Sequence, residues 1–349
     1  MIDENQTVLL ELIKCSLFGS VPCLPVDTKW DEVLQEAQAQ TVVAIAASAV
    51  PKELSAPWAE PVAKNTAHFM RVLFEQKKLT ELFTKSGIPF VILKGCAAAV
   101  YYPRPECRTM GDVDFLVSED KFETSRLLLE ENGYRFERDF GDGRDYIYTK
   151  GGVVLELHQR YSDADFNIEP VLTGKLSNPV VREIKGIEFP SLPDCENGLV
   201  LLDHIRHHLK GGLGIRQIID WMMFVHAVLD DETFNNAFLT LTESAGLTTF
   251  CRIVTKMCKM HFGLPDSITW CDSADGKTAD ELYENVFKSG NFGRKNPYVY
   301  KPMESLTIGI KKNGLFKTLQ RAGVENFSIC KRNRFFRAFA WLFQIFRYL

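Results

Sequence analysis

Two aspartates, Asp112 and Asp114, stand one residue apart inside the apolar run "GDVDFLV". This run is typical of a buried strand, where two neighbouring carboxylates are costly unless a cation lies between them. Residues i and i+2 of a strand point to the same face, so both carboxylates share a face while Val113 and Phe115 point into the core. Such carboxylates can share divalent ions, and Mg²⁺ binds carboxylates together with substrate phosphates. The alternative is a pair exposed at a strand edge or bound to arginines.

A third acid follows in "VVLELHQR", where Glu156 stands between Leu155 and Leu157 and shares the polar face with His158. Three acids on neighbouring strands are what metal-assisted phosphoryl or nucleotidyl transfer requires, because the ions contact the attacking and leaving oxygens. Glu156 is therefore a candidate metal ligand or catalytic base, with a plain surface residue as the alternative. We expect His158 to be a hydrogen-bonding neighbour of the acids.

The segment before the aspartates contains residues suited to phosphate. Gly95 follows a predicted strand and opens a predicted helix, so backbone N–H groups there can face a phosphate without a Cβ in the way. Lys94 and Arg108 are candidates for neutralising a triphosphate. The alternatives are a surface charge for Lys94 and a salt bridge to an aspartate for Arg108.

Hydrophobic periodicity predicts the elements that position these residues. Residues 5–50 and 62–86 are predicted to be helical, 88–93 and 112–117 to be strands, and 144–161 to be a hairpin turning at Gly151-Gly152. After Pro193 the pattern is helical almost to the end. We therefore predict an N-terminal helical segment (1–61), an α/β core (62–190) and a helical C-terminal region (191–349).

The succession "GIPFVILKG", "YYPRPECRTMGDVDFLV", "ENGY" and "LELH" resembles the uncharacterised nucleotidyltransferase family of the polymerase-β-like superfamily. The helical stretch "GIRQIIDW" (214–221) is also similar, so the resemblance covers roughly residues 30–225. It implies an α+β fold: a small mixed β-sheet nucleotidyltransferase core with flanking helices and a mainly helical C-terminal region.

The resemblance also implies roles for individual residues. Gly95 would hold nucleotide phosphate, Asp112 and Asp114 would bind Mg²⁺, and Glu156 would be the third acid. Cys96 stands where many relatives have Ser or Gly, so a hydroxyl contact to phosphate is missing there, although it remains a candidate nucleotide-binding residue.

The expected activity is transfer of a nucleoside monophosphate from an NTP to an acceptor hydroxyl, with Mg²⁺ as cofactor, Mn²⁺ as a substitute and pyrophosphate as product. The acceptor stays open among a small molecule, a sugar, a protein and an RNA end, with nucleic acid the less favoured. One alternative is a nucleotide-binding or scaffolding protein without turnover, which Cys96 alone favours. Another is a toxin-like nucleotidyltransferase that modifies protein or tRNA.

Two further groups lie in the helical part of the sequence. His204, His207 and His208 share one helical face, which suggests either zinc or a helix packed at the rim of the site, and we favour the second. Arg216 and Asp220 are expected to form a buried pair that joins the helical part to the catalytic core.

Charge and cysteine use indicate the class of protein. The net charge is −4, yet residues 308–349 contain nine Lys or Arg and one acid, Glu325. The basic aromatic segment 331–349 includes "AFAWLFQIF", which is too short to span a bilayer; we expect a packed helix, with a membrane surface or a partner protein as alternatives. Nine cysteines without regular spacing and an acidic N-terminus without a signal peptide indicate a cytoplasmic protein, with a membrane-peripheral location as the alternative.

Overall fold

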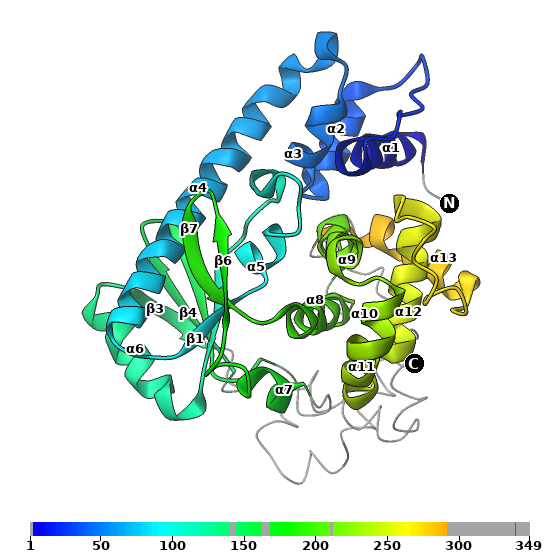
Figure 1. The fold of residues 1–349 in the computed structure, drawn as a ribbon. Helices are drawn as coiled ribbons and strands as arrows, with labels where there is room; N and C mark the ends of the chain where they lie inside the picture. Colours follow the sequence, from blue (N-terminus) through cyan, green and yellow to red (C-terminus); the bar gives the residue numbers. More distant parts are fainter. Residues whose placement is uncertain (1–2, 140–143, 162–167, 210–211, 292–338, 340–349) are drawn as a thin grey trace.

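The computed structural model describes residues 3–139, 144–161, 168–209, 212–291 and 339. A seven-stranded sheet lies on one side of the molecule and a helical body lies on the other, with α5 and α8 between them (Figure 1). In spatial order the strands are β3 (Arg135–Asp139), β4 (Asp145–Lys150), β5 (Val153–His158), β2 (Val113–Val117), β1 (Phe90–Leu93), β7 (Ile187–Ser191) and β6 (Val180–Ile184).

The sheet is mixed, as predicted. β1 pairs antiparallel with β2 and parallel with β7, while β2 pairs parallel with β5. The hairpins β3–β4, β4–β5 and β6–β7 are antiparallel. All five residues of β2 are buried because this strand lies between β5 and β1, near the middle of the sheet. The predicted α+β class is therefore confirmed.

Helices surround the sheet and form the rest of the described chain. They are α1 (Glu4–Phe18), α2 (Trp30–Ala39), α3 (Val43–Ala46), α4 (Ala56–Lys85), α5 (Gly95–Ala99), α6 (Phe122–Glu131), α7 (Glu169–Thr173), α8 (Asp194–His208), α9 (Ile215–Val228), α10 (Asp231–Thr233), α11 (Leu239–Ala245), α12 (Thr248–Met257) and α13 (Gly276–Ser289). Short 3₁₀ turns cover Ala47–Ala49, Lys52–Leu54, Pro105–Cys107 and Glu119–Lys121, and π-helical turns cover Phe234–Phe238 and Cys258–Phe262.

Some elements differ from the predictions. α4 begins at Ala56 rather than residue 62 and continues through Pro61. The hairpin β6–β7 was not predicted, since its turn residues Lys185 and Gly186 both have positive φ but lack the Asn-Gly or Gly-Gly signature of such turns. β3 was also missed, because its five residues are all exposed at the edge of the sheet and have no apolar alternation.

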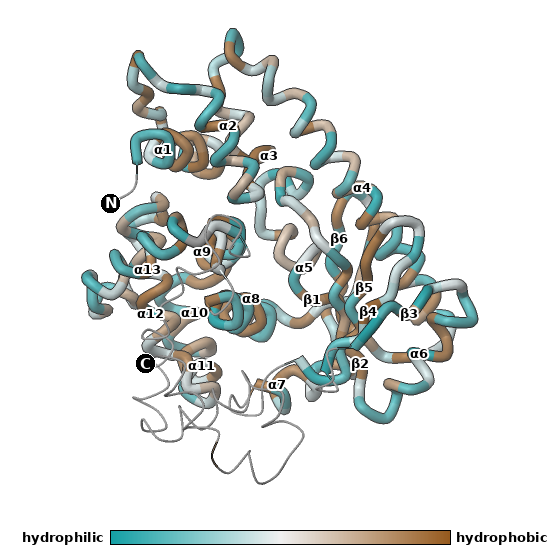
Figure 2. The backbone as a smooth tube through the Cα atoms, turned by 180° about the vertical axis from the view of Figure 1, so that it is seen from behind, coloured by the Kyte–Doolittle hydropathy of each residue, from teal (hydrophilic) through white to brown (hydrophobic). Residues whose placement is uncertain are grey.

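Two hydrophobic clusters hold these elements together. One packs α4 and α6 against the sheet and contains the edge-to-face rings of Phe83 and Phe115. The other joins α1–α3 to α8, α9 and the later helices, so the helical ends of the chain share one core. Figure 2 shows the hydrophobic colours in α1 and in the middle strands, while β3 at the sheet edge is hydrophilic.

The predicted three-part division of the chain stays a prediction. Within the described residues, no helix combines the length and the apolar character needed to cross a membrane. The basic aromatic segment 331–349 lies outside the described residues except for Phe339, so its role also stays a prediction.

Candidate active site

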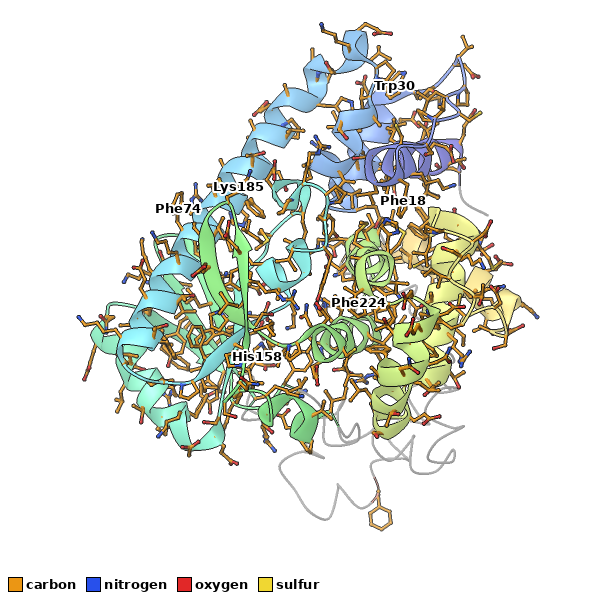
Figure 3. The ribbon with its side chains drawn as sticks, viewed as in Figure 1. Phe18, Trp30, Phe74, His158, Lys185 and Phe224 are labelled. Atoms are coloured by element: carbon orange, nitrogen blue, oxygen red, sulfur yellow. The ribbon has the colours of Figure 1, made fainter. Side chains whose placement is uncertain are left out.

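A cavity of about 300 Å³ lies between the sheet and helices α8 and α9. Figure 3 shows His158, one of its lining residues, between the sheet and α8. The sheet side contributes Lys94, Gly95, Gly111, Asp112, Asp114, Arg144, Asp145, Glu156 and His158; the remaining lining residues are Arg108, Tyr161, Asp203, His204, Arg206, His207, His208 and Arg216.

Strand register brings the three predicted acids to this cavity. Asp114 in β2 lies directly opposite Glu156 in the parallel neighbour β5, so the two side chains share a face. Asp112 comes just before β2 and lines the same cavity. The alternative of a pair exposed at a strand edge does not apply, because β2 lies inside the sheet and the Asp114 side chain is only 4% exposed.

The carboxylate of Asp114 is held by two cationic groups. Lys94 donates from Nζ to Asp114 Oδ1 at 2.7 Å, and His158 donates from Nε2 to the same oxygen at 3.1 Å. Burial alone would raise the pKa of Asp114, but the charge of Lys94 and the hydrogen bond from His158 hold it well below its usual value. Asp114 is therefore ionised at every physiological pH.

His158 lies between two carboxylates. Its Nδ1 is 2.7 Å from Asp145 Oδ1, and its Nε2 faces Asp114, so both ring nitrogens donate and the ring is an imidazolium. Burial would lower the pKa of His158, but the charge of Glu156 and the bonds to Asp114 and Asp145 raise it to about 10. The sequence-based interpretation of His158 as a hydrogen-bonding neighbour agrees with this geometry.

Asp145 was missed by sequence analysis, although the sequence contains its signal. The hairpin turns at Gly151-Gly152. If residues are counted outward from this turn along both strands, Asp145 lies opposite His158. Arg144 and Tyr161, which also line the cavity, carried no comparable signal.

The other two acids are destabilised in their ionised forms. Burial, followed by the charge of Asp114, raises the pKa of Asp112 to about 6. Burial also raises the pKa of Glu156 to about 7, with Asp114 and Asp112 adding to the effect and Lys94 opposing it. Both shifts follow mainly from burial, and the neighbouring carboxylates add to them.

The residues present fit a divalent cation. Four carboxylates, those of Asp112, Asp114, Asp145 and Glu156, line the cavity together, and the positive charges that act on them come from Lys94, His158, Arg144 and Arg216. One ligand atom each from Asp114, Glu156 and His158 lies within 4.8 Å of the others. Because both nitrogens of His158 carry protons, carboxylate oxygens are the available ligands, and these suit Mg²⁺ or Mn²⁺.

Arg108 forms a salt bridge to an aspartate, which was the alternative to its predicted role at a triphosphate. Its Nε and Nη2 donate to Asp220 Oδ1 and Oδ2 at 2.7 and 2.8 Å, and Tyr102 donates to the same carboxylate at 2.6 Å. Both partners of this bidentate pair are buried, so the charge of Arg108 is already neutralised. Asp220 does join the helical part to the core, but its partner is Arg108 rather than Arg216.

Arg216 lines the cavity instead. Its residue is 7% exposed, Nη1 donates to Thr109 O at 3.0 Å, and Nε has no partner among the described residues. Burial, followed by the charge of Arg108, lowers its pKa. A buried guanidinium with an unused donor beside a cavity is suited to an anionic ligand.

Gly95 lines the cavity as predicted, whereas the side chain of Cys96 does not. Cys96 is fully buried in the cluster beneath the sheet, where burial raises the pKa of its thiol to about 12. The position of Cys96 in α5 directs its thiol into the core, so the prediction of Cys96 as a nucleotide-binding residue stays a prediction about its backbone.

The three histidines of α8 lie at the rim of the cavity, which is the alternative that we favoured. His204 and His208 place their Nε2 atoms 2.8 Å apart, and the ring centroids of His207 and His208 are 5.9 Å apart. Burial, followed by the neighbouring histidine, lowers the pKa of both His204 and His208, to about 3 for His208, so this pair is neutral. Among the described residues, no set of three metal-ligating side chains includes them, so zinc is not supported.

Comparison with known proteins gives a family match. A family model described as "Uncharacterised nucleotidyltransferase" matches residues 27–263. None of the curated proteins matches the chain. Among solved structures, ANT(2")-Ia in complex with adenylyl-2"-tobramycin is 13% identical, with 50% of this chain and 98% of that chain covered at a TM-score of 0.36. An antigenic nucleotidyltransferase-like protein from Paracoccidioides brasiliensis is 14% identical, with 57% and 94% covered at a TM-score of 0.35.

Proposed function

We propose, since this chain belongs to the uncharacterised nucleotidyltransferase family, that it transfers a nucleoside monophosphate from an NTP to an acceptor hydroxyl in a Mg²⁺-dependent reaction. Pyrophosphate is the second product. The observation that carries the proposal is the convergence of Asp112, Asp114 and Glu156 on one cavity that also contains Lys94 and Arg216.

The acids have distinct roles in this proposal. Asp112 and Asp114 hold the metal, and Glu156 completes the ligand set or accepts the proton of the attacking hydroxyl. When bound, Mg²⁺ or Mn²⁺ supplies positive charge at the oxygens of the reacting phosphate. His158 keeps the Asp114 carboxylate in a fixed orientation, because Asp145 anchors the other side of its ring.

The phosphate side of the cavity is assigned to Lys94, Gly95 and Arg216. Gly95 has no side chain between its backbone and the cavity, and Arg216 supplies a positive charge at the same cavity. Arg108 also lines the cavity, but we assign it a supporting position, because its guanidinium is bonded to Asp220. These residues support the triphosphate as the anionic ligand.

The acceptor is assigned to the side of the cavity formed by α8. His204 and His208 are neutral hydrogen-bonding groups there, and the carboxylate of Asp203 is already paired with Arg206 at 2.7 Å. This side is suited to hydroxyl groups, which agrees with a small molecule, a sugar or a protein side chain as acceptor. The alternative of a protein without turnover rested on Cys96 alone, and we do not favour it, because the cavity still brings three acids together.

Calorimetry tests the proposal. Each NTP is titrated with and without Mg²⁺ into the wild type, into an Asp112→Asn/Asp114→Asn double variant and into an Asp266→Asn control, whose side chain is fully exposed. We expect one NTP to bind only with Mg²⁺, and the double variant alone to lose this binding. Absence of binding for every NTP at every Mg²⁺ concentration would contradict the proposal.

A further inference from the structure

The ammonium group of Lys94 lies inside the acid cluster, where a metal ion would otherwise approach. Its Nζ is 2.7 Å from Asp114 Oδ1, and the two side chains are 14% and 4% exposed. The charge of Glu156 also acts on it, and the group lies 5.3 Å from the ring centroid of Tyr161. Lys94 is therefore a counter-ion of the predicted metal ligands Asp114 and Glu156.

The backbone at Lys94 is held in an unusual conformation that directs the side chain to this place. Its φ of 46° and ψ of −126° lie in a region that side-chain-bearing residues rarely adopt. The preceding residue, Leu93, pairs with Asp114 across β1 and β2, and the carbonyl of Lys94 accepts from Ala98 N at 2.7 Å. The strand pairing before Lys94 and the hydrogen bond to its carbonyl hold its backbone in this strained conformation. Strained backbone of this kind is found mainly at functional positions.

The two cations at Asp114 differ in their freedom to move. His158 is anchored on its other side by Asp145, at 2.7 Å. Lys94 has one hydrogen-bonding side-chain partner among the described residues, Asp114, and a flexible four-carbon stem. A new anion beside Gly95 would therefore draw away Lys94 and leave His158 in place.

We propose that Lys94 blocks the metal ligands of the free enzyme until nucleotide arrives, so that metal and nucleotide bind together rather than metal first. This inference rests on the proposed function. A metal ion at the Asp114 carboxylate would lie within a few ångströms of the ammonium group, and two positive charges that are largely shielded from water repel each other strongly. Triphosphate oxygens give Lys94 another partner, so each ligand favours the other by the same factor.

The first test measures Mn²⁺ binding without nucleotide by electron paramagnetic resonance of the free ion. Lys94→Met should bind Mn²⁺ about tenfold or more tighter than the wild type, within the usual range of coupling between two ligands. Lys94→Arg, which keeps the charge, should bind as weakly as the wild type. Lys175→Met is the matched control, because Lys175 pairs with Glu196 at 3.1 Å outside the residues that line the cavity. Mn²⁺ binding by Lys94→Met that is equal to or weaker than in the wild type would overturn the inference.

A second measurement uses the wild type and so does not depend on the folding of a variant. The side-chain ¹⁵N signal of Lys94, assigned with Lys94→Arg, should shift when Mg²⁺ and the α,β-methylene analogue of the calorimetrically identified NTP are added together. Mg²⁺ alone should leave the ¹⁵N chemical shift of Lys94 unchanged. A chemical shift that also stays unchanged when the nucleotide is added would overturn the inference. If calorimetry shows Mg²⁺-dependent NTP binding while Lys94→Met leaves Mn²⁺ affinity unchanged, only this inference fails. If no NTP binds, the proposed function fails, and this inference fails with it.

Discussion

His158 and Asp145 face each other across the β4–β5 hairpin, and the 2.7 Å bond between His158 Nδ1 and Asp145 Oδ1 fixes the imidazolium against Asp114. The orientation of the central carboxylate in β2 therefore depends on a residue two strands away. Groups that orient metal ligands in this way affect metal affinity nearly as much as the ligands themselves.

Asp145→Asn should weaken Mg²⁺-dependent NTP binding about 10- to 100-fold, the usual effect of removing such an orienting group. The amide oxygen still accepts the bond from His158, but the negative charge that favours the imidazolium is lost. Calorimetry measures the affinity, and NMR titration of His158 should show a lower pKa. Unchanged affinity, equal to that of the Asp266→Asn control, would contradict this role of Asp145.

The stability of the protein should depend on pH and Mg²⁺ together. Asp112 and Glu156 have pKa values raised to about 6 and about 7 in the folded metal-free protein, above their ordinary values of 3.8 and 4.5. These two acids thus bind more protons in the folded state, so their contribution to stability falls as pH rises from about 4 to 7. The raised pKa of His158 acts in the same direction, because its contribution is complete below about 6.5 and is lost as pH rises through about 10.

Mg²⁺ competes with these protons, so it should raise Tm more at about pH 8 than at about pH 5.5. Thermal unfolding with Mg²⁺ and with EDTA at both pH values measures the difference. The Asp112→Asn/Asp114→Asn variant should show no Mg²⁺ effect at either pH. An equal shift of the wild-type Tm at both pH values would argue against carboxylates as the ligands.

Arg216→Gln should weaken Mg²⁺-dependent NTP binding by about tenfold or more, the size expected for loss of a charged hydrogen bond. The nucleoside monophosphate should be less affected, because the guanidinium is assigned to the outer phosphates. Calorimetry with both nucleotides makes the comparison, with Arg135→Gln on exposed β3 as the control. Equal losses for the triphosphate and the monophosphate would contradict the assignment.

The sequence was sufficient to predict that Asp112, Asp114 and Glu156 lie together, because the period of two in strands places them by local rules. The mixed sheet around them was also predicted. The bond between Arg108 and Asp220 joins residues 112 positions apart, and no local pattern in the sequence distinguishes Asp220 from Asp114 as the partner. The same holds for Arg216, whose place at the cavity follows from the packing of α9 against α5.

The direction of the Cys96 side chain could not be predicted from the sequence for a different reason. Gly95 and Cys96 both belong to the first turn of α5, and a helix turns by about 100° at each residue, so neighbouring positions face different surroundings. A phosphate-binding role for one of them therefore does not extend to the next side chain. Lys94 was predicted as a phosphate ligand, and its contact with Asp114 depends on a positive φ that its residue type does not suggest.

Removal of Asp220 should be costly, because the Arg108 and Asp220 side chains are only 3% and 2% exposed. Asp220→Ala leaves a buried guanidinium without its partner, which typically costs about 3–5 kcal/mol of unfolding free energy. Urea unfolding measures this loss, and Arg108→Met/Asp220→Leu should recover part of it. Glu60→Gln, which breaks the exposed pair with Lys64, should leave the unfolding midpoint unchanged. Wild-type stability of Asp220→Ala would show that the bidentate pair contributes nothing.

Gly198 marks the contact between the two helices that form the far wall of the cavity. A Cβ at this position of α8 would lie 2.2 Å from Cζ of Phe224 in α9, a ring labelled in Figure 3. Gly→Ala inside a helix normally stabilises a protein by about 1 kcal/mol. Here we expect Gly198→Ala to destabilise it by about 1–3 kcal/mol, because α8 and α9 must move apart.

The same movement should weaken NTP binding, since α8 bears His204 and His208 while α9 bears Arg216. Gly276→Ala is the control, because its Cβ would meet Met260 Cε at an ordinary 3.9 Å. Thermal unfolding and NTP calorimetry on both variants separate the two effects. If Gly198→Ala is as stable as the wild type, the close approach of α8 and α9 is not required. If it is less stable yet binds NTP normally, the spacing of these helices does not set the position of Arg216.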